Sequence, residues 1–235
     1  VPWFVAQVAT CADNGSFRCT IPGDQLAVVE ARPRRFFFAL PTYALPFSSD
    51  GVHYSAVGAQ TLGQYLGFVR SRVLISGQDW TGLTPSGAAS CSGATVVIPW
   101  HSPCQQIGTC AGAALVFDTS LTCPMMGSGD TLCREGFEFF DPNTVPRHVT
   151  GIAISGQSVV LTLNGTCQSG SYWSTGHTHV SSADGGSYGA ARVRLADTSN
   201  VVGLYSAALV NRAAIVSPRA ISGGVGRCCP RGPRS

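Results

Sequence analysis

The sequence contains no lysine and few charged residues of any kind. Only 11% of its 235 residues are charged, and all 15 basic residues are arginine; an average protein has about 25% charged residues. The net charge of +3 is spread along the chain, with a local excess only in the stretch 227–234. A nucleic-acid groove needs basic residues clustered on one face. We therefore expect no nucleic-acid partner.

Long hydrophobic runs are also missing. The sequence has no stretch of about 18 apolar residues, the length that a bilayer-spanning helix requires, so no membrane association is expected. A secretion signal begins with a basic segment followed by an apolar one, and this pattern does not open the chain. The first residue is Val1 and not methionine. Together these features predict a processed or truncated product.

A third missing pattern is two cysteines separated by two residues, which is typical of zinc sites and thioredoxin-type redox sites. The ten cysteines stand at other spacings. Two interpretations stay open: disulfides formed in an oxidising compartment, or buried free thiols that act as small hydrophobic side chains. The first would place the protein in an extracellular or periplasmic location. The pairing itself cannot be deduced from a sequence.

The first 76 residues alternate between apolar runs and helical patterns. Residues 1–10 form a largely apolar run without alternation, as expected of a strand covered on both faces, and residues 35–40 form a second one. Between them a helix is expected to start near Pro22 and to end before Pro33. Ser55 is a candidate N-cap for another helix, whose apolar residues recur at helical spacing: Val57, Leu62, Leu66, Val69 and Val73. This order of elements is typical of an α/β domain.

From about residue 76 the pattern changes to short β-prone segments separated by turn-forming residues. The expected strands lie at 94–99, 113–118, 136–140, 149–154, 158–163, 189–195 and 213–216. Regularly spaced short strands predict a β-sandwich or a jelly-roll-like domain. The residues 155–157, between two of these strands, predict a hairpin turn. We place the boundary between the two parts near residues 76–79.

Asp50 and His53 are the residues whose spacing points to chemistry. They lie in a loop directly before the helix that Ser55 is expected to begin. A carboxylate beside a histidine can fix the tautomer of the imidazole, so that the other ring nitrogen accepts a proton from a serine hydroxyl. On spacing alone, the alternative is a capping aspartate next to an unrelated loop histidine.

The stretch 50–63, which begins Asp50-Gly51-Val52-His53, resembles the final sequence block of the SGNH hydrolases, and among them the sialate O-acetylesterase-like carbohydrate esterases. The strand at 1–10 and the helix around Gln25 are similar to the segments that precede this block. Parts of the second half resemble the β-domain appended to some of these enzymes, namely 115–119, 136–139 and 193–198. The resemblance implies the C-terminal part of a flavodoxin-like three-layer α/β domain at 1–76, an accessory all-β sandwich at 77–220 and a disordered tail at 221–235.

The same resemblance implies a catalytic role for the pair in the loop. His53 would be the general base and Asp50 its orienting acid in the removal of O-acetyl groups from a carbohydrate through an acyl-serine intermediate. No metal and no organic cofactor are implied. The nucleophilic serine and the oxyanion-hole residues of this family are expected before Val1, so the chain alone should be inactive unless a missing N-terminal segment or a partner chain supplies the serine. Gly156-Gln157-Ser158 follows the histidine and lies between two expected strands, so we interpret it as a turn.

Two other groups of residues have both a functional and a structural interpretation. Aromatic side chains could form a platform for a sugar, although in sandwiches they more often belong to the core; these are Trp80, Trp100, Tyr172 and Trp173. His177 and His179 alternate as they would on one face of a strand, which is a spacing of metal ligands. Because no third ligand is evident, a surface pair is the preferred interpretation and no metal site is predicted.

These patterns together predict the C-terminal part of a secreted or periplasmic carbohydrate esterase that acts on an acetylated carbohydrate. Two other functions stay open. One is a non-catalytic carbohydrate-binding or adhesion module in which the β-domain acts. The other is a structural surface or tail protein that retains part of an esterase domain.

Overall fold

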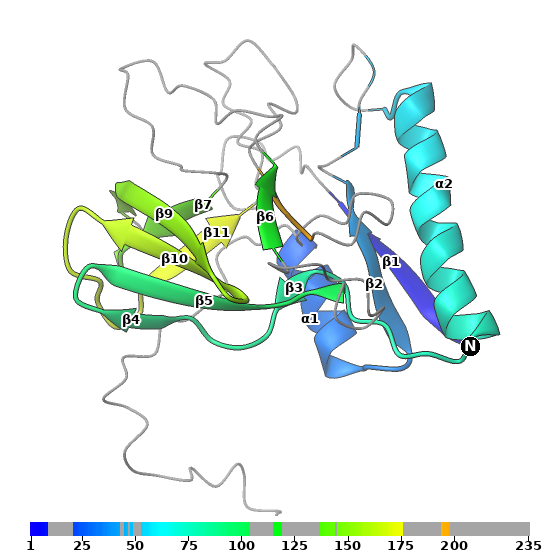
Figure 1. Cartoon of the computed structure of the whole chain (residues 1–235), viewed down its shortest axis with the longest axis horizontal. Coiled ribbons are helices and arrows are strands. Elements are labelled where there is room, and N and C mark those ends of the chain that lie inside the picture. Colours follow the sequence, from blue (N-terminus) through cyan, green and yellow to red (C-terminus); the bar gives the residue numbers. More distant parts are fainter. Residues whose placement is uncertain are drawn as a thin grey trace, which may run out of the picture.

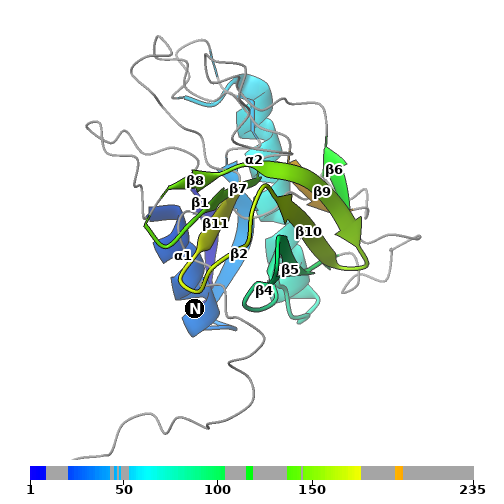
Figure 2. The ribbon, with the colours of Figure 1, turned by 90° about the vertical axis from the view of Figure 1, so that its left-hand side faces the viewer.

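The computed structural model describes residues 1–8, 21–42, 45–46, 48, 53–103, 115–118, 137–143, 145–175 and 194–197. Two groups of elements lie side by side in Figure 1, and Figure 2 shows one of them in front of the other. One group consists of two parallel strands and their helices, and the other is built from antiparallel strands. The second group follows the first along the chain.

The first group is built around a parallel strand pair. Its elements are β1 (Trp3–Gln7), α1 (Ile21–Ala31), β2 (Phe36–Pro41), α2 (Ala56–Arg70) and the π-helical turn η2 (Ser71–Ile75). Phe37 and Ala39 of β2 share a buried cluster with Tyr65 of α2. Phe38 instead packs in a cluster with Leu26 of α1. Successive residues of a strand face opposite sides, so the two helices cover opposite faces of β2.

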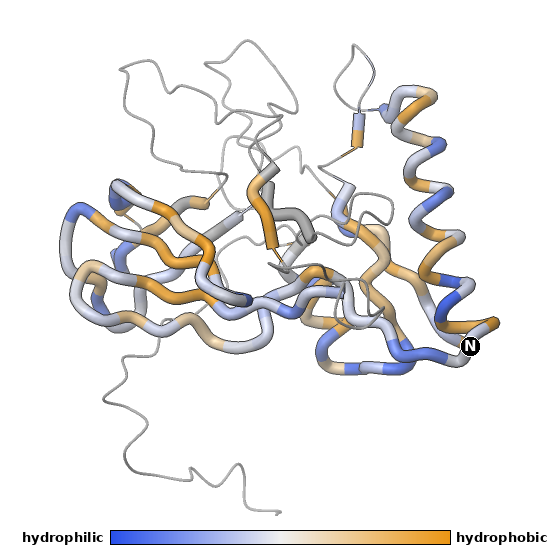
Figure 3. Tube along the Cα trace, in the orientation of Figure 1, coloured by the Kyte–Doolittle hydropathy of each residue, from blue (hydrophilic) through white to orange (hydrophobic). Residues whose placement is uncertain are grey.

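Most boundaries expected in this region are confirmed, with two corrections in side-chain burial. Val57 was expected on the buried face of its helix, but it is 60% exposed, and Tyr65 is fully buried instead. The strand at 1–10 was expected to be covered on both faces, but Trp3 is 59% exposed. Among the described residues β1 pairs only with β2, so one edge of this strand remains open there. Along α2, hydrophobic and hydrophilic residues alternate, as Figure 3 shows.

Among the described residues, the antiparallel group contains three sheets. The largest joins β3 (Thr84–Pro85), β4 (Ser90–Ser92), β5 (Thr95–His101), β10 (Ser158–Leu163) and β9 (Val149–Ser155). A second sheet has the order β11 (Tyr172–Thr175), β7 (Phe137–Phe140), β8 (Pro146–Arg147), and a third pairs β12 (Arg194–Asp197) with β6 (Leu115–Asp118). Strands β9 and β10 are joined by the expected hairpin turn, where Ser155 pairs with Ser158 and Gly156 has φ 58°. The expected strand at 213–216 and the tail at 221–235 lie outside the described residues.

Side chains from the two groups share their cores. Leu26 and Phe38 belong to the same buried cluster as Ile98 and Leu161 of the large antiparallel sheet. Trp80, on the other side of the predicted boundary at 76–79, belongs to the cluster of α2 and β2. Apolar packing is therefore continuous across this position. The division into an α/β domain and a sandwich stays a prediction.

A disulfide joins Cys91 of β4 to Cys167, which lies between β10 and β11. The interpretation as disulfides is thus confirmed for this pair, while the other eight cysteines lie outside the described residues. Disulfides persist in oxidising compartments, which is compatible with an extracellular location. In the described parts of the chain, no helix is long and apolar enough to cross a membrane.

Candidate functional site

The loop that carries His53 is closed at its base by backbone hydrogen bonds. The amide of Ser48 donates to the carbonyl oxygen of His53 at 2.8 Å, and the amide of Ser55 donates to that of Pro46 at 3.0 Å. The hydroxyl of Ser48 also donates to the His53 carbonyl, at 3.0 Å. These bonds hold His53 at a defined position between β2 and α2. Asp50, the predicted orienting acid, lies outside the described residues.

The start of α2 fixes this loop from its other side. Ser55 is the N-cap, as expected, and its hydroxyl oxygen accepts from the amide of Gly58 at 3.1 Å. Gly58 is buried against Pro46, and a Cβ at this position would overlap the carbonyl oxygen of Pro46. Position 58 must therefore lack a side chain for the loop to approach the helix so closely. The cap and the glycine together fix the loop that carries His53 against the start of α2.

The side chain of His53 is exposed to solvent. It follows the carboxyl end of β2, and in α/β folds ligands bind outside the carboxyl ends of the parallel strands. Polar contacts tie the strand ends there: the hydroxyl of Thr42 donates to the carbonyl oxygen of Gln7 at 2.9 Å, and the amide of Val8 donates to Oε1 of Gln25 at 2.9 Å. An exposed imidazole on such a frame can exchange a proton with a bound ligand.

The prediction that aromatic side chains form a platform for a sugar is wrong for the three tryptophans. Trp100 is 1% exposed and Trp173 0% exposed, and their rings pack edge to face with centroids 5.9 Å apart. Trp80 is also buried, and its indole Nε1 donates to the carbonyl oxygen of Phe38 at 2.9 Å. These rings form core contacts and are not available to a sugar from solvent. Tyr172 is partly buried, so its sugar contact stays a prediction.

Metal binding finds no support in the described residues. There, no group of three or more histidine, cysteine, aspartate or glutamate side chains is placed to hold a metal ion. His177 and His179 lie outside the described residues.

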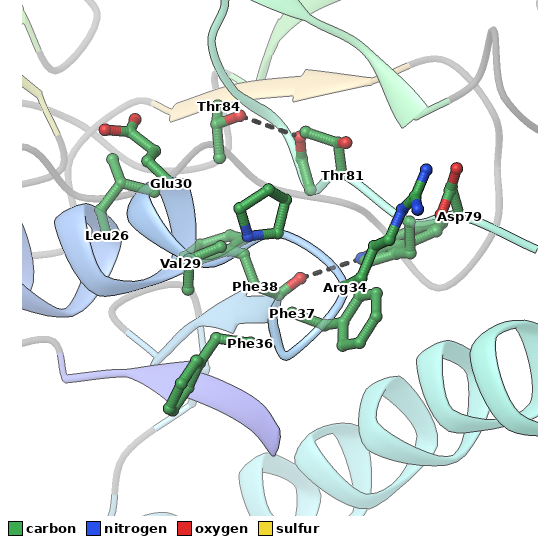
Figure 4. A pocket seen from close by; sticks show the side chains of 13 residues that line it. Leu26, Val29, Glu30, Arg34, Phe36, Phe37, Phe38, Asp79, Thr81 and Thr84 are labelled. Atoms are coloured by element: carbon green, nitrogen blue, oxygen red, sulfur yellow. Dashed lines mark hydrogen bonds between the residues drawn. The ribbon is translucent and has the colours of Figure 1, made fainter. Parts of the chain in front are cut away.

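Sequence patterns missed a cavity at the other end of β2, shown in Figure 4. It has a volume of about 250 Å³ and is lined by the end of α1, the start of β2 and the segment 79–84. Arg34 and Asp79, two charged residues of its lining, are 45 positions apart in the chain. Only the packing of the segment 79–84 on β2 brings them together. No local spacing could have indicated the cavity.

Neither a protein-family model nor a curated protein sequence matches this chain. Among solved structures, the chain is similar to a carbohydrate acetylesterase from Xanthomonas citri, with a TM-score of 0.53 and 13% sequence identity. The alignment covers 88% of this chain and 40% of the other, so the chain spans less than half the length of that enzyme. At this identity the similarity concerns the fold, and it extends across both groups of elements described above.

Proposed function

We propose that the chain is part of a carbohydrate esterase of the SGNH type, related to the sialate O-acetylesterases, and that it removes O-acetyl groups from a sugar. The observation that carries this proposal is the exposed His53, held by a closed loop at the carboxyl end of β2 and at the start of α2. The fold similarity to a carbohydrate acetylesterase supports the same class of reaction. In this proposal the domain organisation is the one expected from the sequence.

His53 is the general base in the proposed mechanism. Its exposed imidazole accepts the proton of a serine hydroxyl as the serine attacks the acetyl carbonyl, and it then delivers this proton to the sugar oxygen that leaves. A water molecule releases acetate from the serine in the second half of the reaction. Asp50, three residues before His53, is proposed to accept a hydrogen bond from the inner ring nitrogen and so to fix the tautomer.

The serine nucleophile is proposed to come from a polypeptide segment outside these 235 residues. The turn at Gly156-Gln157-Ser158 is unsuited to the role because it joins two antiparallel strands, whereas a nucleophile turn of this kind joins a strand to a helix. The edge of β1 that does not face β2 is without a partner among the described residues. A parallel strand that ends in the serine could add to this edge.

A fluorophosphonate probe, which labels activated serines, and p-nitrophenyl acetate test this proposal. The chain alone should be neither labelled nor active, and both properties should appear when the serine-bearing segment is supplied. In that complete protein, His53→Ala should lower kcat by about 10⁴-fold or more. The control is His101→Ala, since His101 is also exposed but lies on β5. Equal rates for wild type and His53→Ala would remove His53 from the chemistry.

The same assays separate the two alternative functions. A binding or adhesion module would bind glycans without hydrolysing any acetyl ester, and a structural protein would do neither. The burial of Trp100 and Trp173 removes the main observation that favoured a sugar-binding platform on the antiparallel strands. The esterase is therefore the function that the described site supports best.

A further inference from the structure

The cavity beside Arg34 and Asp79 lies at the opposite end of β2 from His53. Of the residues that line it, Phe36 is the first residue of β2 and Arg34 precedes that strand, whereas His53 follows the last residue of β2. The cavity thus lies on the amino side of the parallel strands. The proposed esterase site lies on their carboxyl side. A ligand in this cavity would occupy a place of its own.

Charged groups of both signs flank the cavity. The guanidinium of Arg34 and the carboxylate of Asp79 extend toward the same side in Figure 4, and Glu30 lies at the other end. Arg34 and Asp79 are exposed, and no ion pair joins them in the described structure. A guanidinium only donates hydrogen bonds, whereas a carboxylate only accepts them. A ligand with hydrogen-bond donors and acceptors on neighbouring atoms can therefore bind to Arg34 and Asp79 at the same time.

The inner wall of the cavity is apolar and held in place. It includes Val29 of α1 and Phe38 of β2, which pack in the same apolar cluster. The segment 79–84 is fixed against this wall, because the Trp80 indole donates to the Phe38 carbonyl at 2.9 Å and because Gly82 is so close to the Phe38 ring that a Cβ would overlap it. A preformed site loses less entropy on binding than a flexible one.

The backbone of Arg34 supports a role for its side chain. Its φ of 71° is the only positive value at a non-glycine residue in the described chain. Glycine adopts this conformation without steric cost, and arginine does not. Strained residues of this kind cluster at functional sites. The positive φ belongs to the turn 32–35, in which the amide of Arg35 donates to the carbonyl oxygen of Arg32 at 3.2 Å, and this turn places Arg34 at the mouth of the cavity.

We propose that this cavity binds a neutral sugar ring, with its hydroxyl groups on Arg34 and Asp79 and an apolar face on the inner wall. Hydroxyl groups both donate and accept, as the two charged residues require. The lining holds two carboxylates and one guanidinium, which disfavours an anionic sugar. The volume of about 250 Å³ is below the range of about 300–1,000 Å³ for drug-sized ligands, so one ring is expected and not an oligosaccharide.

Saturation-transfer NMR on the 235-residue chain tests the proposal, with D-galactose, D-glucose and D-xylose as neutral probes and N-acetylneuraminic acid as the anionic one. At least one neutral sugar should bind with a Kd in the millimolar range, and the anionic sugar should bind more weakly. This measurement needs no hydrolysis, so it succeeds or fails independently of the proposed esterase activity.

Two variants then place the bound sugar. Arg34→Gly removes the guanidinium and relieves the backbone strain, so it should raise Tm while weakening binding at least tenfold. Asp79→Asn keeps the shape and removes the charge, and it should weaken binding to a similar degree. The control is Arg32→Ala, because Arg32 is exposed nearby but does not line the cavity.

Three results would overturn the inference. The first is that no neutral sugar binds at 20 mM. The second is that Arg34→Gly and Asp79→Asn bind as well as Arg32→Ala does. The third is that binding is lost in His53→Ala but kept in Arg34→Gly, which would put the sugar at the other end of β2.

Discussion

The parallel and antiparallel parts of the molecule are held together in different ways. Around His53 the structure depends on close contacts between backbone atoms. Hydrogen bonds join the two ends of the loop, and the carbonyl group of Pro46 lies against Gly58 of α2. Around Trp173 it depends on buried aromatic rings and on a covalent link between Cys91 and Cys167. Small changes should therefore displace the candidate site, whereas larger deletions are needed to unfold the antiparallel core.

Trp173→Ala should have the largest effect. The indole is 0% exposed and packs against Trp100 and Phe137, and removing such a ring costs about 3–5 kcal/mol of stability. Urea unfolding followed by circular dichroism measures this loss. Tyr172→Ala is the control on the adjacent, partly buried position and should cost clearly less. Equal losses in the two variants would contradict the assignment of Trp173 to the core.

Removal of the disulfide should follow in size. Cys91 and Cys167 are 76 residues apart, and closing a loop of this length lowers the entropy of the unfolded chain enough to stabilise the fold by about 4 kcal/mol in the chain-entropy model. The double variant Cys91→Ser/Cys167→Ser should lose most of this amount in the same unfolding assay. A reducing agent should destabilise wild type more than this variant, which lacks the bond between positions 91 and 167. No difference between them would mean that the bond does not form.

Gly58→Ala should have a smaller but more local effect. A methyl group at position 58 overlaps the carbonyl oxygen of Pro46, so we expect a loss of about 1–3 kcal/mol as the loop moves away. Gly63→Ala in the same helix is the matched control, because a Cβ there meets nothing within 4 Å. It should stabilise the protein by about 0.5–1 kcal/mol through its helix propensity. The prediction fails if both variants change stability with the same sign.

The smallest effect is expected from the turn between β7 and β8. The carboxylate of Asp141 accepts from the amides of Val145 and Asn143, both at 2.9 Å, and from Nη2 of Arg147 at 3.0 Å. These bonds, that of Val145 foremost, hold the pKa of Asp141 below its ordinary value, although burial acts in the opposite direction. The stabilisation is therefore present above the unfolded pKa of about 4 and is lost as the pH falls through the lower folded value.

Asp141→Asn checks this sign. The variant should be less stable than wild type at pH 7, and the difference should shrink as the pH is lowered below about 4. Thermal unfolding between pH 2 and 7 measures it. A difference that grows toward acid pH would show that the carboxylate is not stabilising.

Local signals made most elements predictable from the sequence. Pro33 ends the region of α1, Ser55 caps α2, and Gly156 makes the turn between β9 and β10. Each of these depends on residues within a few positions of one another. Val57 was expected to be buried but is exposed, and this has a physical reason. Helical spacing shows that one face of the helix is apolar, but the position of the neighbouring strand decides which turns of that face are covered.

The candidate sites were harder to predict because they depend on contacts between distant residues. An aromatic residue in a strand has the same pattern whether it faces a core or a ligand, and Trp100 proved to alternate with Val96 and Ile98 on the buried side of β5. The cavity beside Arg34 depends on a segment 45 residues further along. The place of His53, directly before α2, could be predicted because a helix start is a local signal, whereas its catalytic role stays a prediction.

The most direct test of the proposed Asp50–His53 pair is a double-mutant cycle in the deacetylation assay, with the serine-bearing segment present. If Asp50 acts only by orienting His53, the double variant Asp50→Asn/His53→Ala should be as slow as His53→Ala alone, because residues that act as a unit are not additive. Losses that multiply, or full activity in Asp50→Asn, would contradict the pairing.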